Sequence, residues 1–275
     1  MILIGTSGYS YADWRGFFYP PQTAEKDFLE YYARHFNVCE LNFTYYQIPS
    51  PRTFERMIEK SGGKVEFVAK AHQSITHGRD AGIEGITRFG KALEPLWRAK
   101  LLGGILLQFP FSFRSEKINY EYVRRLRDSF ADLPLVAEFR KRSWIKERTF
   151  DFLRELNVGF CNVDEPRLPG LMPPTAETTS EIGYFRFHGR NQAKWWEHED
   201  QAERYDYLYT EEELREWVPR IRKVESKTKK TYVFTNNHFQ AKAVKNAVML
   251  KDLLFPHPHP SPLEGEDSSR VKSRE

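Results

Sequence analysis

Ionisable and amide side chains recur at the downstream ends of segments that have the composition of β-strands. In a strand, side chains two residues apart point to the same face, and these polar residues share one parity within each run. Parallel strands are normally apolar on both faces, and burying an unpaired charge costs several kcal/mol. The pattern therefore predicts side chains that pair with one another or meet a ligand. The set comprises Glu40, Asn42, Lys70, His72, Gln108, Glu138, Arg140, Asn162, Asp164, Arg186, His188, Arg190, Asn236 and His238.

The charges in this set favour an anionic ligand. Guanidinium groups bind carboxylate or phosphate through paired N–H donors, whereas a divalent metal beside several cations would be repelled. We expect an anionic or phosphate-bearing small molecule and favour an enzyme of hydrolase, lyase or isomerase type. Metal-independent acid–base chemistry is assigned to Glu40, Glu138, Asp164 and His188. The residues expected to bind the substrate are Asn42, Lys70, Gln108, Arg140, Arg186, Arg190, Asn236 and His238.

Aromatic residues lie close to these strand ends in the sequence. Tyr9 and Trp14 follow the first β-type run, and Trp196 follows the seventh. Flat side chains could stack on a base, a sugar or another planar group, or they could anchor long loops. We include all three among the expected ligand contacts.

Two alternative functions stay open. One is a nucleic-acid-binding or metal-dependent nuclease-like barrel. The other is a non-catalytic ligand-binding or scaffold protein, in which the polar set is only an internal ion-pair network.

No cofactor motif is found in the chain. GxGxxG, GxxxxGK[ST], HExxH and GxSxG are all absent, so no cofactor is predicted. A divalent metal bound by the His and carboxylate residues is an alternative that no local spacing supports. The two cysteines, Cys39 and Cys161, are too few for a zinc cluster and are expected to be small buried residues.

The composition is that of a globular chain without a membrane segment. Of 275 residues, 40% are apolar and 29% are charged, with a net charge of +4. This mild balance does not indicate a concentrated nucleic-acid-binding face. Neither a run of about 18 apolar residues nor a signal-peptide pattern occurs. We therefore expect a cytoplasmic protein without a membrane partner, while the oligomeric state is not predicted.

Strand-type and helix-type segments alternate along the chain. Eight β-type runs are separated mostly by segments whose apolar residues recur every three or four positions. This alternation favours a single α/β domain, a (β/α)8 barrel of the TIM type, over a doubly wound sheet, which would need a glycine-rich phosphate loop. The C-terminal strand ends of such a barrel form its site. The runs are Ile2–Thr6, Val38–Phe43, Val65–Ala71, Gly103–Phe109, Leu135–Phe139, Val158–Val163, Gly183–His188 and Thr231–Thr235.

The helix pattern is incomplete in one place. Pro166–Ser180, after the sixth run, is rich in Pro and Thr and predicts a long loop, so a helix there is missing or irregular. The barrel is expected over residues 1–255, and the polar, proline-rich segment 256–275 is expected to be disordered. The predicted helices are Thr23–Phe36, Pro51–Lys60, Ile86–Lys100, Tyr120–Phe130, Arg148–Leu156, Thr210–Val224 and Gln240–Leu254.

A series of motifs occurs in a fixed order, namely GTSGYSYADWRGFFYP, ELNFTYY, FVAKAHQSITH, LLQFPFSF, VAEFRKRSW, NVDEP, YFRFHGRN, RYDYLY and TNNHFQAKAVKNAVML. Together they resemble the YecE-like family known as domain of unknown function 72, over roughly Met1–Phe255. The resemblance implies a TIM barrel and brings no established biochemical activity. Phe239 and Gln240 depart from the family pattern, in which small residues are common there. The family motifs fall on Glu40, Asn42, Lys70, Gln108, Glu138, Arg140, Asp164, Arg186, His188, Gly189, Arg190, Asn236 and Asn237.

Overall fold

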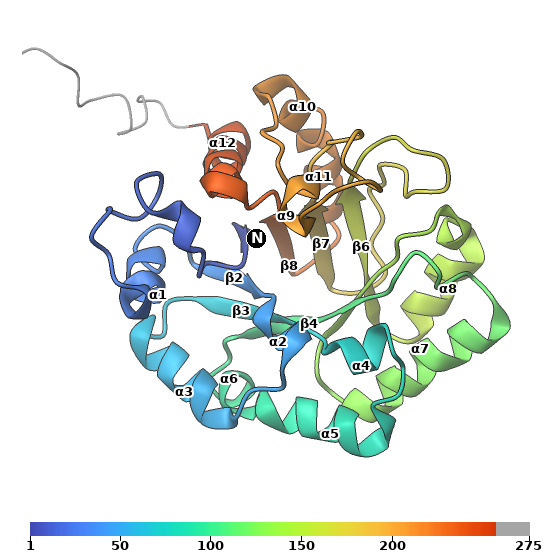
Figure 1. Cartoon of the computed structure of the whole chain (residues 1–275). Helices are drawn as coiled ribbons and strands as arrows, with labels where there is room; N and C mark the ends of the chain where they lie inside the picture. Colours follow the sequence, from blue (N-terminus) through green and yellow to red (C-terminus); the bar gives the residue numbers. More distant parts are fainter. Residues whose placement is uncertain (257–275) are drawn as a thin grey trace, which may run out of the picture.

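Eight parallel strands close into a barrel in chain order in the computed structural model, which describes residues 1–256 (Figure 1). Each strand pairs with the next one, and β8 pairs with β1. This confirms the predicted (β/α)8 barrel. Apart from its first residue, the tail predicted to be disordered lies outside the described residues. The strands are β1 Ile2–Ser7, β2 Val38–Leu41, β3 Glu66–Lys70, β4 Leu102–Gln108, β5 Leu135–Glu138, β6 Val158–Asp164, β7 Ile182–Phe187 and β8 Lys230–Thr235.

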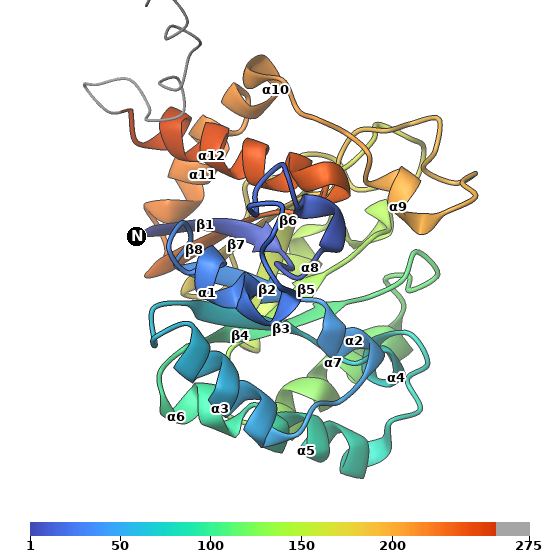
Figure 2. The same ribbon diagram turned by 60° about the vertical axis from the view of Figure 1, so that its left-hand side comes forward.

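Helices surround the barrel, and short ones also lie at the end to which the strand arrows point (Figures 1 and 2). The α-helices are α1 Phe28–Tyr32, α2 Phe43–Tyr46, α3 Pro51–Lys60, α4 Gln73–Thr76, α5 Gly82–Ala92, α6 Glu94–Arg98, α7 Lys117–Phe130, α8 Glu147–Glu155, α9 Gln201–Arg204, α10 Glu211–Arg215, α11 Val218–Glu225 and α12 Lys242–Leu254. The 3-10 helices are η1 Ala12–Trp14, η2 Glu25–Asp27, η3 Arg142–Trp144 and η4 Phe239–Ala241. Within residues 1–256, none of the helices is long and apolar enough to cross a bilayer.

Prolines divide two of the helices that the sequence predicts as continuous. The expected helix Ile86–Lys100 is α5 followed by α6, which has Pro95 in its first turn. The expected helix Thr210–Val224 is α10 followed by α11, with Pro219 in the first turn of α11. Proline has no backbone N–H to donate and fits the first turn of a helix, so each proline marks a new start.

The connection between β6 and β7 contains no helix, as the sequence predicts. Residues 165–181 form an irregular segment. Asn162 of β6 fixes this segment: its amide nitrogen donates to the carbonyl of Glu177, and its amide oxygen accepts from Thr175 and from the backbone N–H of Glu177. The segment thus occupies the position that a helix takes elsewhere around the barrel.

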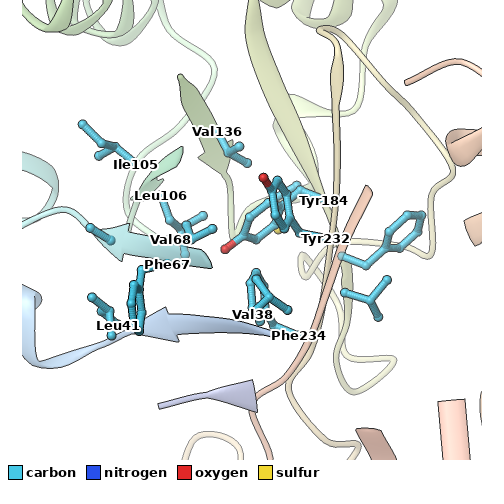
Figure 3. Packing of buried hydrophobic residues seen from close by; sticks show 14 of the residues in the cluster. Val38, Leu41, Phe67, Val68, Ile105, Leu106, Val136, Tyr184, Tyr232 and Phe234 are labelled. Carbon is cyan, nitrogen blue, oxygen red and sulfur yellow. The ribbon is translucent and has the colours of Figure 1, made fainter. Parts of the chain in front are cut away.

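Apolar and aromatic side chains fill the barrel below its C-terminal mouth. Figure 3 shows Val68, Leu106 and Val136 around Tyr184 and Tyr232, whose ring centroids are 6.1 Å apart. At the opposite end of the barrel, the Tyr232 hydroxyl donates to Glu66, which also accepts from Lys230 at 2.8 Å. The barrel interior below the mouth is therefore a packed core.

We expect Gly5→Ala to destabilise the barrel. A Cβ at Gly5 would lie 2.2 Å from the carbonyl oxygen of Val38, a backbone atom that cannot rotate away. The free energy of unfolding should fall by about 1–3 kcal/mol or more, measured by denaturant titration. Gly90→Ala is the control, because its Cβ would meet only side-chain atoms at 3.8 Å and alanine favours a helix. Equal stability of the two variants would contradict the close packing of Gly5 against the Val38 carbonyl.

Candidate functional site

The strand register assigns each side chain at the mouth to the inside or the outside of the barrel. Residues paired across neighbouring parallel strands face the same side. Ser7 is paired with Glu40, Gln108 with Glu138, and Val163 with Arg186. The inward set at the mouth consists of Ser7, Glu40, Lys70, Gln108, Glu138, Val163 and Arg186, followed beyond the strand ends by His188 and Asn236.

The parity predicted for β6 is wrong. Asn162 is paired with Phe185 and Asp164 with Phe187, and both of these phenylalanines contact Trp217 outside the barrel. Asn162 and Asp164 therefore face outward, while Cys161 and Val163 of the same strand face the interior. This strand is buried on both faces, so its residue types do not indicate which parity is internal.

Asp164 and Arg190, predicted as site residues, form a separate ion pair outside the barrel. The Nη2 of Arg190 lies 2.6 Å from Asp164, and its Nη1 lies 3.2 Å from Glu213 of α10. The indole N–H of Trp217 also donates to the Asp164 carboxylate. This cluster fastens the segment after β7 to α10 and α11, so Asp164 does not reach the mouth with Glu40 and Glu138.

Inside the barrel, Arg186 joins two buried carboxylates. Its Nη2 lies 2.6 Å from Glu40 Oε1, and its Nη1 lies 2.6 Å from Glu138 Oε2 and 2.9 Å from Gln108 Oε1. From below, the Tyr184 hydroxyl donates to Glu40 at 2.6 Å. Glu40, Glu138 and Arg186 are at most 1% exposed. The predicted convergence of these three residues from β2, β5 and β7 is therefore present.

Arg140 extends the network to a third carboxylate. Its Nε lies 2.8 Å from Glu138 Oε1, and its Nη1 lies 3.0 Å from Glu165 Oε2. Glu165 also accepts the backbone N–H of Met172 at 2.9 Å. Burial raises the pKa of Glu165 to about 7, although Arg140 opposes the shift. Arg186 and Arg140 hold the pKa of Glu138 well below its usual range against the effect of burial.

His188 is neutral and has a fixed orientation. Its Nε2 lies 3.1 Å from Glu138 Oε1, and its Nδ1 lies 3.0 Å from the side-chain nitrogen of Asn236. An amide N–H at Nδ1 requires a ring acceptor there, so the ring proton is on Nε2 and is donated to Glu138. Complete burial, together with the positive charge of Arg140, lowers the pKa of His188 to about 3.

A cavity of about 700 Å³ lies above this network, within the size range of small-molecule sites. Of the predicted site residues, those that line it are Tyr9, Asn42, Lys70, Gln108, Arg186, Asn236 and His238. Glu40, Glu138 and His188 are absent from its lining and are fully buried. The cavity walls also contain Tyr11, Tyr45, Tyr46, His77, His198, Asp200, Arg204 and Tyr205.

Lys70 differs from Arg140 and Arg186 at the barrel mouth because it has no carboxylate partner. Its Nζ lies 4.2 Å from the ring centroid of Tyr45. Among the described residues, no carboxylate oxygen lies within 4.0 Å of the Lys70 Nζ, the distance limit for an ion pair. Burial, reinforced by the positive charge of Arg186, lowers the pKa of Lys70 to about 7. The amine therefore exchanges its proton near neutral pH.

The aromatic residues predicted as a stacking wall have three different positions. Tyr9 lines the cavity, but Trp14 is fully buried, and its indole N–H donates to the carbonyl of His238 at 2.7 Å. Trp196 is 52% exposed and packs against Phe111, away from the cavity lining. The predicted ligand contacts of Trp14 and Trp196 are therefore not supported by their positions. The His238 ring, stacked on Tyr11 at 4.7 Å, forms part of the wall instead.

Several residues of the site are missing from the sequence prediction. Glu165 is missing because the parity of β6 was misassigned, and correct parity would have placed it inside after Cys161 and Val163. Tyr45 lies in the short helix α2 after β2, and His77 directly follows the short helix α4 after β3, where sequence periodicity gives no direction for a side chain. Repeated aromatic and histidine residues directly after strand ends are the signal that could have identified them.

Within residues 1–256, no group of three or more His, Cys, Asp or Glu side chains has an arrangement suited to a metal ion. The divalent-metal alternative therefore stays a prediction from residue types alone. Both cysteines are free and buried.

The fold and the mouth together define a (β/α)8 barrel whose cavity lies over a buried ion-pair network. The chain belongs to the family described as protein of unknown function DUF72, whose model matches residues 3–266. This confirms the family resemblance seen in the sequence, and the family brings no established activity.

Individual relatives agree with this assignment. The chain is 31% identical over 270 residues to the UPF0759 protein YunF of Bacillus subtilis (strain 168), covering 92% of this chain and 95% of the relative. A DUF72 family protein from Thermotoga maritima MSB8 has a similar crystal structure, with a TM-score of 0.85, 42% identity and coverage of 92% and 99%. Another from Enterococcus faecalis V583 has a TM-score of 0.81, 27% identity and coverage of 92% and 95%.

We expect Asp164→Ala to destabilise the protein strongly. The substitution removes the only fully buried carboxylate of this cluster, which leaves the Trp217 indole without its acceptor and Arg190 with only the more exposed Glu213 and Glu216. Removing one partner of a buried pair costs about 3–5 kcal/mol, measured as the free energy of unfolding. Asp151→Ala is the matched control, because its pair with Arg154 is exposed and such pairs contribute about 0–1 kcal/mol. A loss below 1 kcal/mol for Asp164→Ala would contradict its structural role.

We expect the His188 imidazole to stay neutral at pH 5, protonated on Nε2. Its folded pKa of about 3 lies below the usual value of 6.5. The unfolded chain therefore binds the additional proton, and this group makes the fold less stable as the pH falls from about 6.5 towards 3. Nitrogen-15 NMR of the histidine rings tests this, with the His188 signal assigned by its loss in His188→Gln. A titration midpoint above pH 6 would overturn the assignment.

Proposed function

We propose that this protein binds an anionic small molecule in the barrel-mouth cavity, with the anionic group placed over Lys70. One observation carries the proposal: a basic side chain without a carboxylate partner lies at the cavity floor. An anion bound there would neutralise Lys70, as the buried carboxylates neutralise Arg140 and Arg186. Gln108 and Asn42 add amide groups to the same cavity lining, and Arg186 and Arg204 add two guanidiniums.

The charge balance of the network supports coupling between anion binding and proton uptake. Two guanidiniums, Arg140 and Arg186, are joined to three carboxylates, Glu40, Glu138 and Glu165. The excess negative charge is neutralised either by a proton on Glu165 or by the Lys70 ammonium. Both groups have a pKa of about 7. When Glu165 and Lys70 are both protonated, the group carries one net positive charge, and a bound anion favours this state because it neutralises that charge.

Glu40, Glu138 and His188 act in this proposal as positioning residues rather than catalytic ones. They are fully buried beneath the cavity floor, and their hydrogen bonds hold Arg186 and each other. A scaffold made only of ion pairs accounts for this lower layer. It does not account for a roomy cavity above it, or for Lys70 being left outside the network.

The nucleic-acid alternative receives less support. Its stacking wall required Trp14 and Trp196, which are buried beneath the wall and outside the cavity lining, respectively. The cytoplasmic location stays part of the proposal, since free buried cysteines are common in reducing compartments.

We expect sulfate, a dianion throughout the neutral range, to bind with net uptake of protons at pH 7. Calorimetry in two buffers of different ionisation enthalpy measures that uptake. The affinity should fall between pH 6 and pH 8, because Lys70 loses its charge as the pH rises through about 7. Lys70→Met should bind sulfate about 10–100-fold more weakly, the effect of losing a charge-assisted hydrogen bond of about 1.5–3 kcal/mol.

Lys64→Met is the matched control, because Lys64 is an exposed lysine in the turn after α3 and should leave sulfate binding unchanged. Unfolding transitions of both variants show whether they remain folded. Absence of sulfate binding to the wild-type protein, or equal affinity in wild type and Lys70→Met, would overturn the proposed site.

A further inference from the structure

The two lysines inside the barrel have opposite environments. At the closed end, Lys230 lies 2.8 and 2.9 Å from the two carboxylate oxygens of Glu66. At the mouth, Lys70 faces the Tyr45 ring and the cavity, without such a partner. Both come from strands and both point inward. Lys230 is therefore paired with a carboxylate, whereas the Lys70 amine faces a cavity large enough for a small molecule.

We propose that Lys70 condenses with the carbonyl carbon of an anionic aldehyde or ketone and forms an imine with it. This rests on the proposed function, because the same cavity must first admit the anionic compound. It narrows the ligand class to compounds that carry a carbonyl group as well as a negative charge. The anionic group would then lie near Arg204 on the wall, which lines the cavity and, unlike Arg186, is not part of the buried ion-pair network.

The chemistry is balanced without any additional reactant. The Lys70 nitrogen attacks the carbonyl carbon, a C–N bond forms, and the carbonyl π electrons move to oxygen. The oxygen takes up the two protons that the amine nitrogen gives up and leaves as water, which breaks the C–O bond. No group is oxidised or reduced. Tyr45 and His77, whose ring centroids are 5.0 Å apart, line the same cavity and carry groups that can relay these protons.

The surroundings of Lys70 favour the neutral amine that this attack requires. Positive charges on Arg186 and Arg140 oppose protonation, Glu138 and Glu40 favour it, and burial is the largest effect. His77 is itself held neutral by burial beside Lys70, with a pKa of about 4. At pH 7 an amine with a pKa near 7 is about half neutral, whereas an ordinary lysine is neutral in roughly one molecule in 2,500.

Reductive trapping tests the proposal. The full-length protein is incubated at pH 7 with glyoxylate, a small aldehyde that carries a carboxylate, and sodium borohydride reduces any imine to a stable secondary amine. Peptide mapping by mass spectrometry then locates the modified lysines. We expect Lys70 to be modified at least about tenfold faster than the exposed Lys64 and Lys100. Modification should increase from pH 6 to pH 8, opposite to the affinity for sulfate.

The wild-type protein and one matched variant separate this inference from the proposed function. Lys70→Arg cannot form the imine, so it should show no trapping at position 70, while trapping at the exposed Lys64 should stay unchanged. If wild type binds sulfate but glyoxylate labels Lys70 no faster than the exposed lysines, the imine is refuted and anion binding stands. If trapping at Lys70 is fast but sulfate neither binds nor slows it, anion recognition fails.

Should Lys70→Arg not fold, protection in the wild-type protein replaces it. Sulfate at saturating concentration should slow glyoxylate trapping at Lys70 at least about fivefold and leave trapping at Lys64 unchanged. Equal slowing at both positions would show a general salt effect and would refute the shared site.

Discussion

The buried ion pairs of Arg186 determine how the mouth of this barrel is built. A guanidinium that is 1% exposed survives inside a protein only when carboxylates compensate it. Glu40 and Glu138 do so from strands on different sides of the barrel, each at 2.6 Å. Because the three residues come from β2, β5 and β7, their contacts also fix the relative positions of these strands. Removing Arg186 would leave two carboxylates buried without it, which makes it unsuitable for separating binding from folding.

The rest of the mouth follows from these pairs. Glu138 uses its second oxygen for Arg140 and His188, so the imidazole is oriented through the same carboxylate that holds Arg186. Asn236 closes this chain by donating to the opposite ring nitrogen. The hydrogen-bonding capacity of the lower layer is thus largely used within the protein. What faces the cavity is the upper layer, which consists of amides, tyrosines, histidines, the Asp200 carboxylate, the guanidiniums of Arg186 and Arg204, and the Lys70 amine without an ion-pair partner.

The sequence predicts the barrel well because each of its strands is short, apolar and followed by polar residues. It also predicts Glu40, Glu138, Arg186 and His188 together, since strand parity alone places them inside. Parity fails for β6 because both faces of this strand are buried. Its polar residue Asn162 suggests an inward position, but the side chain binds the segment 165–181 outside the barrel. Strand parity also does not show how deeply a side chain lies below the mouth. Lys70 and His188 both point inward, yet only Lys70 lines the cavity. Depth depends on side-chain length and on loops that the sequence does not place.

The contrast between the two barrel lysines links stability to function. A lysine whose folded pKa lies below its usual value makes the fold less stable, and this penalty is full below pH 7 and declines as the pH rises from about 7 to 10.5. At the other end of the barrel, both carboxylate oxygens of Glu66 accept from the Lys230 ammonium. A carboxylate beside Lys70 would do the same and would stabilise the barrel. It would also keep the amine charged and occupy the position of an anion. An unpaired lysine at the floor of a cavity is therefore better explained by what enters the cavity than by the needs of the fold.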